Sequence, residues 1–583
     1  MTRPQSGNIR YSGYPTSHVY SFARNSKKQL KFTKVKHLLW GDWVKVTDFD
    51  YRVETPDPKK HVPDIKSDAE KTYVDKQLAK IKDGMVPVRV RGVSGYMKLE
   101  DLSPNRLLEV IFIDVGQGDG AVMITPDNKK YVIDAGKGDN MYRYLKWRFN
   151  NFPAQNDFDG FIITHPDNDH YLGFQDIVED ERITCKNIYH NGIVEQFKVE
   201  QDGRQTGENK DLLGPYEDVN GQRYLMGLIK SDQQLSNLLS DKKKWVKTSS
   251  GKGKQFPKLL NTAQTAEGSN GNRRFPKISN LSTKDGEIRD GLSYLPGFGP
   301  DNPDGCEIRI IGPVIEEIDG KDTLRAFNEK PKSKTTSINT GKTKNGHSIL
   351  LKLQYKNLRM LFGGDLNSSA EMFLMKHYTG KDVYDKNPDT MREAMDIAAD
   401  TFQVDVAKAC HHGSADFKDE FLEVVKATAT VISSGDQESH AHPRCDTLGA
   451  LGRNGYGKRP LILSTELSRS AKEFIDKKDT PWFQAERIKG KLETETDPEK
   501  KAELQGEYDR LGEISKVRAV TSYGAINLRS DGEKVVMAYM KEKSSRSSRW
   551  DIYPLEVNED GYLEYIEDDI AEDRESKRRE ANS

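Results

Sequence analysis

One short segment of the chain places four metal-binding side chains directly after an apolar run. Phe161-Ile162-Ile163 leads into Thr164 and then into His165, Asp167, Asp169 and His170. Imidazole and carboxylate ligands together suit Zn, Mn or Fe better than Ca or Mg. Positions 165, 167 and 169 alternate, so they can point into one pocket, while His170 reaches a neighbouring point. The pattern predicts a metal site at the C-terminal end of a strand, with space for two adjacent ions. The competing interpretation is a solvated turn built by Pro166 and Asn168.

Five further segments combine strand-like apolar residues with polar residues at the strand ends. Upstream of the first segment, Phe112-Ile-Asp-Val-Gly-Gln-Gly-Asp119 and Tyr131-Val-Ile-Asp-Ala-Gly136 read as short strands joined by turns. Downstream lie Leu361-Phe-Gly-Gly-Asp365, Cys410-His-His-Gly-Ser414 and His440-Ala-His-Pro443. Two glycines before Asp365 would let its carboxylate approach a bound ion closely. The chain therefore offers ligands from several loops.

This ordered set of motifs resembles the metallo-β-lactamase superfamily. It is most similar to the ComEC-type branch, which includes the nuclease domain of bacterial DNA-uptake channels and a phosphorylcholine esterase. Asp167 stands where the usual His-x-His-x-Asp-His motif has its second histidine, as is typical of that branch. The resemblance covers roughly residues 107 to 175, 305 to 370 and 400 to 450, and two closing strands near 520 to 541.

The resemblance implies a four-layer αββα fold that holds two divalent metal ions, Zn or Mn, and hydrolyses a phosphodiester by attack of a metal-bound hydroxide. One ion would take His165, Asp167 and one of His411 and His412; the other would take Asp169, His170 and His442. Asp365 would bridge the ions, and Asp169 and His412 are the candidate catalytic residues. His440 competes with His442. The residues that would orient the ligands or close strand ends are Asp114, Gln117, Asp119 and Asp134.

Length and composition limit the remaining interpretations. At 583 residues with 35% hydrophobic content, the chain exceeds one typical domain and must carry polar insertions. A net charge of -1 excludes a globally basic nucleic-acid binder but allows a local basic groove. The scattered residues Cys185, Cys306, Cys410 and Cys445 indicate neither a zinc ribbon nor a disulfide scaffold, which favours a reducing, cytoplasmic compartment. No run approaches the roughly 18 apolar residues of a membrane helix.

The chain divides into four predicted parts. Residues 1–36 are basic and are interpreted as a flexible leader, with a transit peptide or a nucleic-acid arm as alternatives. Residues 37–104 alternate apolar and polar positions around glycine turns and resemble a small SH3-like β-barrel, either a docking module or a cap on the catalytic domain. Residues 105–545 form the hydrolase domain, and residues 546–583 form an extension with a charged tail.

Two insertions are predicted within the hydrolase domain. The first, residues 195–304, contains basic clusters at 242–254 and 270–274 that could hold a phosphate backbone, with Trp245 available for base stacking. A solvated loop is the equal alternative. The second, residues 465–516, has the pattern of a charged helical hairpin broken at Asp497-Pro498. This arm could cover the active site, recruit a partner or be an ordinary appendage.

The predicted function is metal-dependent cleavage of a phosphodiester, with DNA as the preferred substrate and bacterial defence as the setting. One alternative is a phosphodiesterase of small molecules, such as a cyclic nucleotide or a phosphorylcholine-type ester. The other is a partner-dependent interaction protein that keeps the fold and docks through its barrel or its 465–516 arm.

Overall fold

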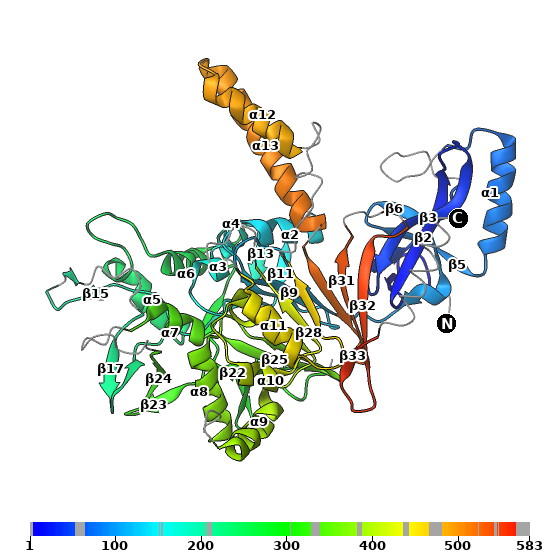
Figure 1. The fold of residues 1–583 in the computed structure, drawn as a ribbon. Coiled ribbons are helices and arrows are strands. Elements are labelled where there is room, and N and C mark those ends of the chain that lie inside the picture. The colour runs from blue at the N-terminus through cyan, green and yellow to red at the C-terminus, as the bar shows by residue number, and fades with distance from the viewer. Residues whose placement is uncertain are drawn as a thin grey trace.

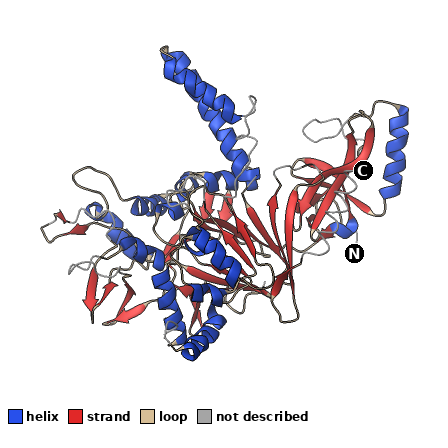
Figure 2. Ribbon diagram, viewed as in Figure 1, coloured by secondary structure: helices blue, strands red, loops and turns tan. Residues whose placement is uncertain are grey.

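The computed structural model of the protein describes residues 4–52, 64–150, 152, 155–202, 204–206, 213–303, 305–327, 338–381, 387–434, 442–465, 481–522, 524–541, 545 and 547–566. It has the mixed α/β architecture that the sequence predicts, with two large sheets at its centre and a smaller sheet at one end (Figures 1 and 2). Within these ranges, no helix combines the length and apolar character needed to cross a membrane.

The larger central sheet has ten strands and carries the first motifs. Its order is β19 (Lys277–Asn280), β14 (Asn187–His190), β12 (Gly160–Ile162), β10 (Lys130–Ala135), β9 (Gly120–Ile124), β8 (Leu108–Phe112), β30 (Ile526–Ser530), β31 (Lys534–Met540), β32 (Trp550–Val557) and β33 (Leu563–Tyr565). Strands β10, β12, β14 and β19 pair in parallel. All five residues of β8 are buried, as expected for a strand covered on both faces.

The second central sheet has eight strands and carries the later motifs. Its order is β20 (Glu287–Arg289), β21 (Leu292–Tyr294), β22 (Cys306–Gly312), β25 (Leu350–Tyr355), β26 (Leu358–Phe362), β27 (Val406–Lys408), β28 (Ala429–Ile432) and β29 (Leu461–Ser464). From β26 to β29 the strands are parallel, so their carboxyl ends meet at one edge of the sheet.

The two central sheets share one hydrophobic core. Phe112 of β8 and Phe362 of β26 lie with their ring centroids 6.3 Å apart in a single cluster drawn from both sheets. Helices cover the outer face of each sheet. Those on the ten-stranded sheet are α2 (Asn140–Arg148), α4 (Phe174–Glu179), α5 (Asp232–Ser240) and α6 (Gln255–Thr265). Those on the eight-stranded sheet are α8 (Ser368–Thr379), α9 (Pro388–Phe402) and α10 (Asp419–Val425).

The predicted flexible leader is wrong, because most of it is folded. A seven-stranded sheet begins at residue 9 and has the order β3 (Leu30–Leu39), β2 (Thr16–Arg24), β6 (Val93–Lys98), β5 (Met85–Val90), β4 (Trp43–Val46), β1 (Ile9–Ser12) and β7 (Leu102–Ser103). Helix α1 (Asp68–Ile81) packs on it. Apolar residues such as Val19 and Val35 are buried while Lys31 and Lys34 face solvent. The strand pattern was concealed by the many lysines on its exposed side.

Two predicted boundaries of the hydrolase domain are also wrong. The predicted insertion 195–304 contains β19, β20 and β21, which belong to the two central sheets. The part outside those sheets includes β15 (Lys198–Val199) paired with β16 (Gln205–Thr206), and β17 (Tyr216–Val219) paired with β18 (Gln222–Leu225). The latter pair is completed by β24 (Lys321–Arg325) and β23 (Glu316–Ile318). At the other end, the predicted extension 546–583 contributes β32 and β33, because β32 pairs along the whole length of β31.

The second predicted insertion contains the helical hairpin that its pattern indicates. Helices α12 (Pro481–Thr494) and α13 (Pro498–Ser522) pack through Ile488, Leu511 and neighbouring apolar residues. The pair extends away from the body of the protein (Figure 1). Residues 466–480 of the predicted insertion and the charged tail from residue 567 lie outside the described residues.

A buried cluster of charges joins the N-terminal sheet to the ten-stranded sheet. Arg529 of β30 forms an ion pair with Glu109 of β8, and its other terminal nitrogen lies 3.9 Å from Asp42, which precedes β4. Arg106 and Arg148 each lie 3.0 Å from Glu109. Arg529, Glu109 and Asp42 are almost fully buried. Because a buried charge without a partner is costly, these groups depend on one another.

We expect Glu109→Gln to destabilise the protein, since it leaves Arg529 buried without its carboxylate. Breaking a buried pair in this way typically costs about 3–5 kcal/mol of unfolding free energy. Urea unfolding followed by circular dichroism measures the change. The matched control is Glu100→Gln, which removes the partner of Lys98 from an exposed pair and should leave the unfolding curve nearly unchanged. Equal unfolding curves for the two variants would show that the charge of Glu109 does not stabilise the buried cluster.

Candidate metal centre

The predicted ligands come from loops that follow strands of both central sheets. His165 and Asp167 follow β12, and helix α3 (Asn168–Tyr171) carries Asp169 and His170. Asp365 follows β26, and the His411-His412 pair follows β27. Because the two sheets pack on one shared core, loops that are far apart in the sequence meet at one site.

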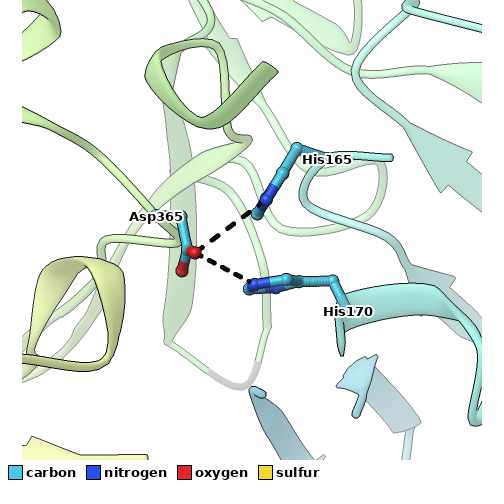
Figure 3. A group of neighbouring side chains, drawn as sticks. All are labelled: His165, His170 and Asp365. Carbon is cyan, nitrogen blue, oxygen red and sulfur yellow. Dashed lines mark ion pairs between the residues drawn. The ribbon is translucent and has the colours of Figure 1, made fainter. Parts of the chain in front are cut away.

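Asp365 lies at the centre of the site. Its Oδ2 atom is 3.1 Å from Nε2 of His412 and 3.3 Å from Nε2 of His170. The Nε2 atoms of His411 and His165 are 3.9 and 4.0 Å from the same oxygen. Figure 3 shows His165 and His170 directed at this carboxylate from one side. Asp365, His165, His170 and His412 are all buried.

The inward direction of His165 and His170 is fixed by hydrogen bonds to their other ring nitrogens. Nδ1 of His170 lies 2.9 Å from Asp134, and Nδ1 of His165 lies 3.1 Å from the hydroxyl of Thr164 and 3.2 Å from that of Ser348. Thr164 itself donates a 2.7 Å hydrogen bond to Asp134. Partners of this kind set the tautomer and direction of metal-binding histidines.

His412 is oriented in the same way from the other sheet. Its Nδ1 lies 3.0 Å from the carbonyl oxygen of Ser433 and 3.0 Å from Asp119. Thus Nε2 of His412, like that of His165 and His170, faces the centre of the site. Asp119 and Asp134 occupy the orienting positions that the sequence suggested for them.

The inward-facing atoms fit a metal ion. Within the described part of the chain, Nε2 of His165, His170 and His412 is buried and has no hydrogen-bond partner, an arrangement that is costly unless another group satisfies these atoms. Ligand atoms on a tetrahedral ion with bonds of about 2.1 Å lie roughly 3.4 Å apart, close to the separations around Asp365. The group His165, His170 and Asp365 could hold a metal ion, and so could the group Asp169, His170 and His412.

The structure groups the candidate ligands differently from the division that the resemblance implies. His412 lies with Asp169, at 3.7 Å, and with His170 rather than with His165 and Asp167. His411 and His412 both have left-handed φ angles, of 47° and 53°. Their ring planes are inclined to each other by 66°, and the side chain of His412 is 2% exposed while that of His411 is 26% exposed.

His442 lies on the open side of the site. Its ring centroid is 5.7 Å from that of His411 and 6.3 Å from that of His412. It lines the same cleft as Asp365 and Asp169. The competing His440 lies outside the described residues.

The two carboxylate oxygens of Asp167 have different partners: one faces the candidate metal site and the other pairs with a lysine. Its Oδ2 atom is 3.6 Å from Nε2 of His165, while Oδ1 forms an ion pair with Lys344 of α7 (Thr340–Gly346). Burial opposes ionisation, but the interaction with His165 and the charge of Lys344 outweigh it and lower the pKa of Asp167. Lys344 also lies 3.1 Å from Glu195. Only one oxygen of Asp167 is left for an ion.

Sequence reasoning missed Lys344 and a second buried lysine, Lys408. Nζ of Lys408 donates a 2.8 Å hydrogen bond to the carbonyl of Gly364, pairs with Asp119 and lies 3.8 Å from Oδ1 of Asp365. Its charge offsets the crowded carboxylates. A lysine at the end of the otherwise apolar strand β27, three residues before the His411-His412 pair, was a signal that could have found it. No local signal identifies Lys344, whose partners are distant in sequence.

Two glycines permit the close approach of the loops. Gly118 has a φ of +104°, and a Cβ atom there would lie 1.7 Å from the carbonyl oxygen of Asp169. Gly364 has a φ of +49°, and its Cβ would lie 2.5 Å from Cβ of Ser348. Any side chain at Gly118 would push α3 away from the site.

The site opens into a broad cleft of about 820 Å³. Lys137, Lys254 and Lys344 line it together with Glu195 and Tyr171. Lys254 is the one lysine of the predicted basic cluster 242–254 among the described lining residues. Trp245 is 8% exposed and donates a 3.0 Å hydrogen bond to the carbonyl of Leu239, so its prediction as a base-stacking residue is wrong. Its ring fills the core under α5 and α6 instead.

The arrangement can bind a divalent ion and place an ester next to it, with lysines nearby to contact an anion. The chain matches no model of a known protein family and no curated protein. The chemical interpretation therefore depends on the geometry of the site itself.

We expect Asp134→Asn to weaken metal binding by about 10–100-fold, because His170 loses the carboxylate that orients it. Isothermal titration with Zn²⁺ and Mn²⁺ measures the affinity. Asp396→Asn, on the exposed face of α9, is the matched control and should bind the ions as the unmodified protein does. An unchanged affinity in Asp134→Asn would contradict the orienting role.

We expect opposite responses to pH from metal-free stability and from metal affinity. Burial lowers the pKa of His170 and His412, but the charge of Asp365, with Asp134 or Asp119, outweighs burial and raises both well above the ordinary value. A raised histidine pKa stabilises the metal-free fold fully below about pH 6.5, and this contribution is lost as pH rises through the raised pKa. Metal ions compete with those protons, so metal affinity should increase as pH rises through the same range.

Thermal melting of the chelator-treated and metal-loaded protein between pH 6 and 9 measures both trends. The stabilisation by metal should grow with pH while the metal-free midpoint falls. For Asp365, burial raises the pKa, but the charges of His412 and His170 lower it well below the ordinary value. Its contribution is therefore lost only in strong acid, below this range. A stabilisation by metal that is independent of pH would contradict the assignment.

Proposed function

We propose that this protein is a metal-dependent hydrolase that cleaves phosphodiester bonds with two divalent ions, and that nucleic acid is its preferred substrate. The observation that carries the proposal is the convergence of His165, His170, His411 and His412 on one carboxylate oxygen of Asp365. Purely structural histidines satisfy both ring nitrogens with protein partners. Here the inward nitrogens of three of them face a shared centre instead.

The architecture supports the proposal. Two sheets share a core, helices cover their outer faces, and the candidate site lies where loops of both sheets meet. This is the arrangement expected of the four-layer αββα metallo-β-lactamase fold, whose motifs the chain resembles. On these two grounds we propose that the protein belongs to that superfamily, and to its ComEC-type branch because Asp167 replaces a histidine.

The ligand atoms available at the site are of the kind that Zn and Mn accept. The residues that would hold the ions are His165, Asp167, Asp169, His170, Asp365 and His412, with His411 and His442 on the open side. When bound, such ions supply Lewis acidity at the phosphoryl group and lower the pKa of a water molecule to about 7.

The residues of the chain have separate tasks in this proposal. Asp169 is 21% exposed at the cleft, where its carboxylate can orient the attacking water and accept its proton. His412 donates through Nδ1 to the carbonyl of Ser433, which leaves the lone pair of Nε2 for ligation. It is therefore a ligand rather than a proton donor. Lys137 and Lys254 at the cleft can contact the non-reacting phosphate oxygens.

The open shape of the cleft favours a polymeric phosphodiester. The cleft has a volume of about 820 Å³, and Lys137 and Lys254 line it together with the candidate ligands. A phosphate backbone can extend out of such an opening, whereas a site for one small ester is usually enclosed. The small phosphodiester remains an outcome of the assay below.

We expect Asp365→Ala and Asp169→Asn each to reduce turnover by at least about 100-fold, because each removes a group that acts on the reacting centre. The assay follows hydrolysis of labelled single- and double-stranded DNA, RNA and bis(p-nitrophenyl) phosphate with Mn²⁺ or Zn²⁺. Asp396→Asn is the control carboxylate variant.

Cleavage of a polymer that is lost in both variants supports the nuclease assignment. Cleavage of only the small ester would replace it by a small-molecule phosphodiesterase. Full activity in Asp365→Ala would contradict the proposed centre, and inactivity with metal bound would favour an interaction protein.

A further inference from the structure

The N-terminal sheet has an outer face that is covered over only part of its area. Val44, Val46 and Val88 point to the inner side, where they pack in the core of the sheet. On the outer side, α1 and its neighbours cover Phe22 and Tyr96. The remainder of the outer side, over β1, β4 and β5, carries side chains that face solvent.

The strand register places five side chains together there. Tyr11 pairs with Trp43, Ile9 pairs with Lys45, and Lys45 pairs with Arg89 on its other side. Because successive side chains alternate between the faces of a sheet, all of these residues point to the same side, opposite the valines. We name this surface the Trp43 face, and it consists of Ile9, Tyr11, Trp43, Lys45 and Arg89.

The Trp43 face combines exposed apolar groups with cations. Trp43 is 43% exposed and Ile9 is 36% exposed. Lys45 is exposed and makes no ion pair with any described residue. The guanidinium of Arg106 lies 5.8 Å from the centre of the Tyr11 ring at the edge of this surface. An indole left in solvent beside cations is typical of a binding surface rather than of a folding core.

The strands β1, β4 and β5 that form the Trp43 face carry cations and no acid, while exposed Asp48 follows β4. The first 41 residues contain eight lysines and arginines and no acidic residue. The first acid, Asp42, is buried and is paired with Arg91. On the β2–β3 hairpin of the same sheet, Lys27, Lys28 and Lys34 are exposed and form no ion pair within the described part of the chain. The surface therefore suits a polyanion.

We propose that the Trp43 face binds a single strand of nucleic acid. A flat aromatic ring stacks on any base, and cations alongside it hold the phosphates, which is the usual combination in sequence-independent single-strand binding. Trp43 supplies the stacking platform, with Tyr11 beside it, and Lys45 and Arg89 contact the backbone. The inference deepens the proposed function, since it names the substrate form and a second place where the chain holds it.

The Trp43 face and the metal cleft lie in different parts of the protein. The N-terminal sheet packs on β31 and β32, near one end of the ten-stranded sheet, whereas α3 lies toward the other end (Figure 1). A long strand can occupy both places, but a small ester reaches only the cleft. Loss of the Trp43 face should therefore leave hydrolysis of bis(p-nitrophenyl) phosphate unchanged.

The test measures binding of the full chain to a fluorescein-labelled 20-nucleotide oligo-dT by anisotropy, with EDTA present so that no cleavage occurs. We expect binding that weakens linearly on a logarithmic scale as salt increases. Trp43→Ala should weaken binding by about 5- to 100-fold, as expected for the loss of one stacked base. Lys45→Glu should weaken it and reduce the salt dependence.

The matched control is Tyr216→Ala, which removes another aromatic side chain that is 43% exposed and lies beside a cation, Arg223 at 5.1 Å. It should bind as the unmodified chain does. Lys321→Glu, at the exposed first residue of β24, is the control for the charge change. Melting midpoints of Trp43→Ala and Lys45→Glu should equal that of the unmodified protein, since both side chains face solvent.

Undiminished binding by Trp43→Ala would overturn the inference, and so would an equal loss in Tyr216→Ala. Competition by polyglutamate as strong as that by unlabelled oligo-dT would overturn it in favour of an acidic protein partner. The result is independent of catalysis: binding that depends on Trp43 without hydrolysis under any metal would retain this inference and reject the proposed nuclease. Hydrolysis of DNA by a chain whose DNA binding does not depend on Trp43 would retain the proposed nuclease and reject this inference.

Discussion

The buried carboxylate of Asp365 is the group on which the organisation of the site depends. A carboxylate removed from water must be matched by positive charge or by a metal ion, because its desolvation is otherwise prohibitive. His170 and His412 approach it from opposite sheets, and Lys408 lies behind it. The two sheets must therefore pack together for the charge of Asp365 to be balanced. Neither sheet alone supplies all the positively charged groups around this carboxylate.

The same principle operates at the junction with the N-terminal sheet. Glu109 is surrounded by Arg106, Arg148 and Arg529, and Asp42 completes the cluster from the N-terminal side. Around it, Trp40 and Leu107 pack with Trp550 and Val536 of the ten-stranded sheet. The N-terminal sheet is thus attached by both apolar and buried ionic contacts. A surface on that sheet keeps a defined position relative to the metal cleft, as a substrate held at two places requires.

Sequence reasoning was strongest where a motif coincides with a strand end. The apolar runs ending in His165, Asp365 and His412 located the loops that the structure brings together, because strand ends in neighbouring sheets share an edge. The α/β class came from the resemblance that these motifs carry, as did the closing strands near 520 to 541, which correspond to β30 and β31. The helical hairpin of α12 and α13 was accessible because its apolar spacing and the break at Pro498 are local signals.

The wrong predictions have physical causes that the order of residues along the sequence does not show. The strands of the N-terminal sheet carry lysines on one side, and their high charge resembled that of a flexible segment. Trp245 stands in a basic tract, but its burial depends on the packing of α5 and α6 around it. The pairing of Lys344 with Glu195 and the grouping of His412 with Asp169 arise from tertiary contacts. Strand β19 joins the large sheet after the long segment that follows β14, and β32 extends the sheet beyond β31, so the domain boundaries were misplaced.

The central claim is that these histidines and carboxylates form a metal centre organised by Asp365. The most direct measurement is anomalous X-ray diffraction, at the absorption edge of the metal, from crystals of the protein grown with Zn²⁺ or Mn²⁺. The account predicts two peaks about 3.5–4 Å apart, with Asp365 between them and histidine Nε2 atoms at bonding distance of about 2.0–2.1 Å. A fully ordered site with no anomalous peak, or with the metal bound elsewhere, would contradict it.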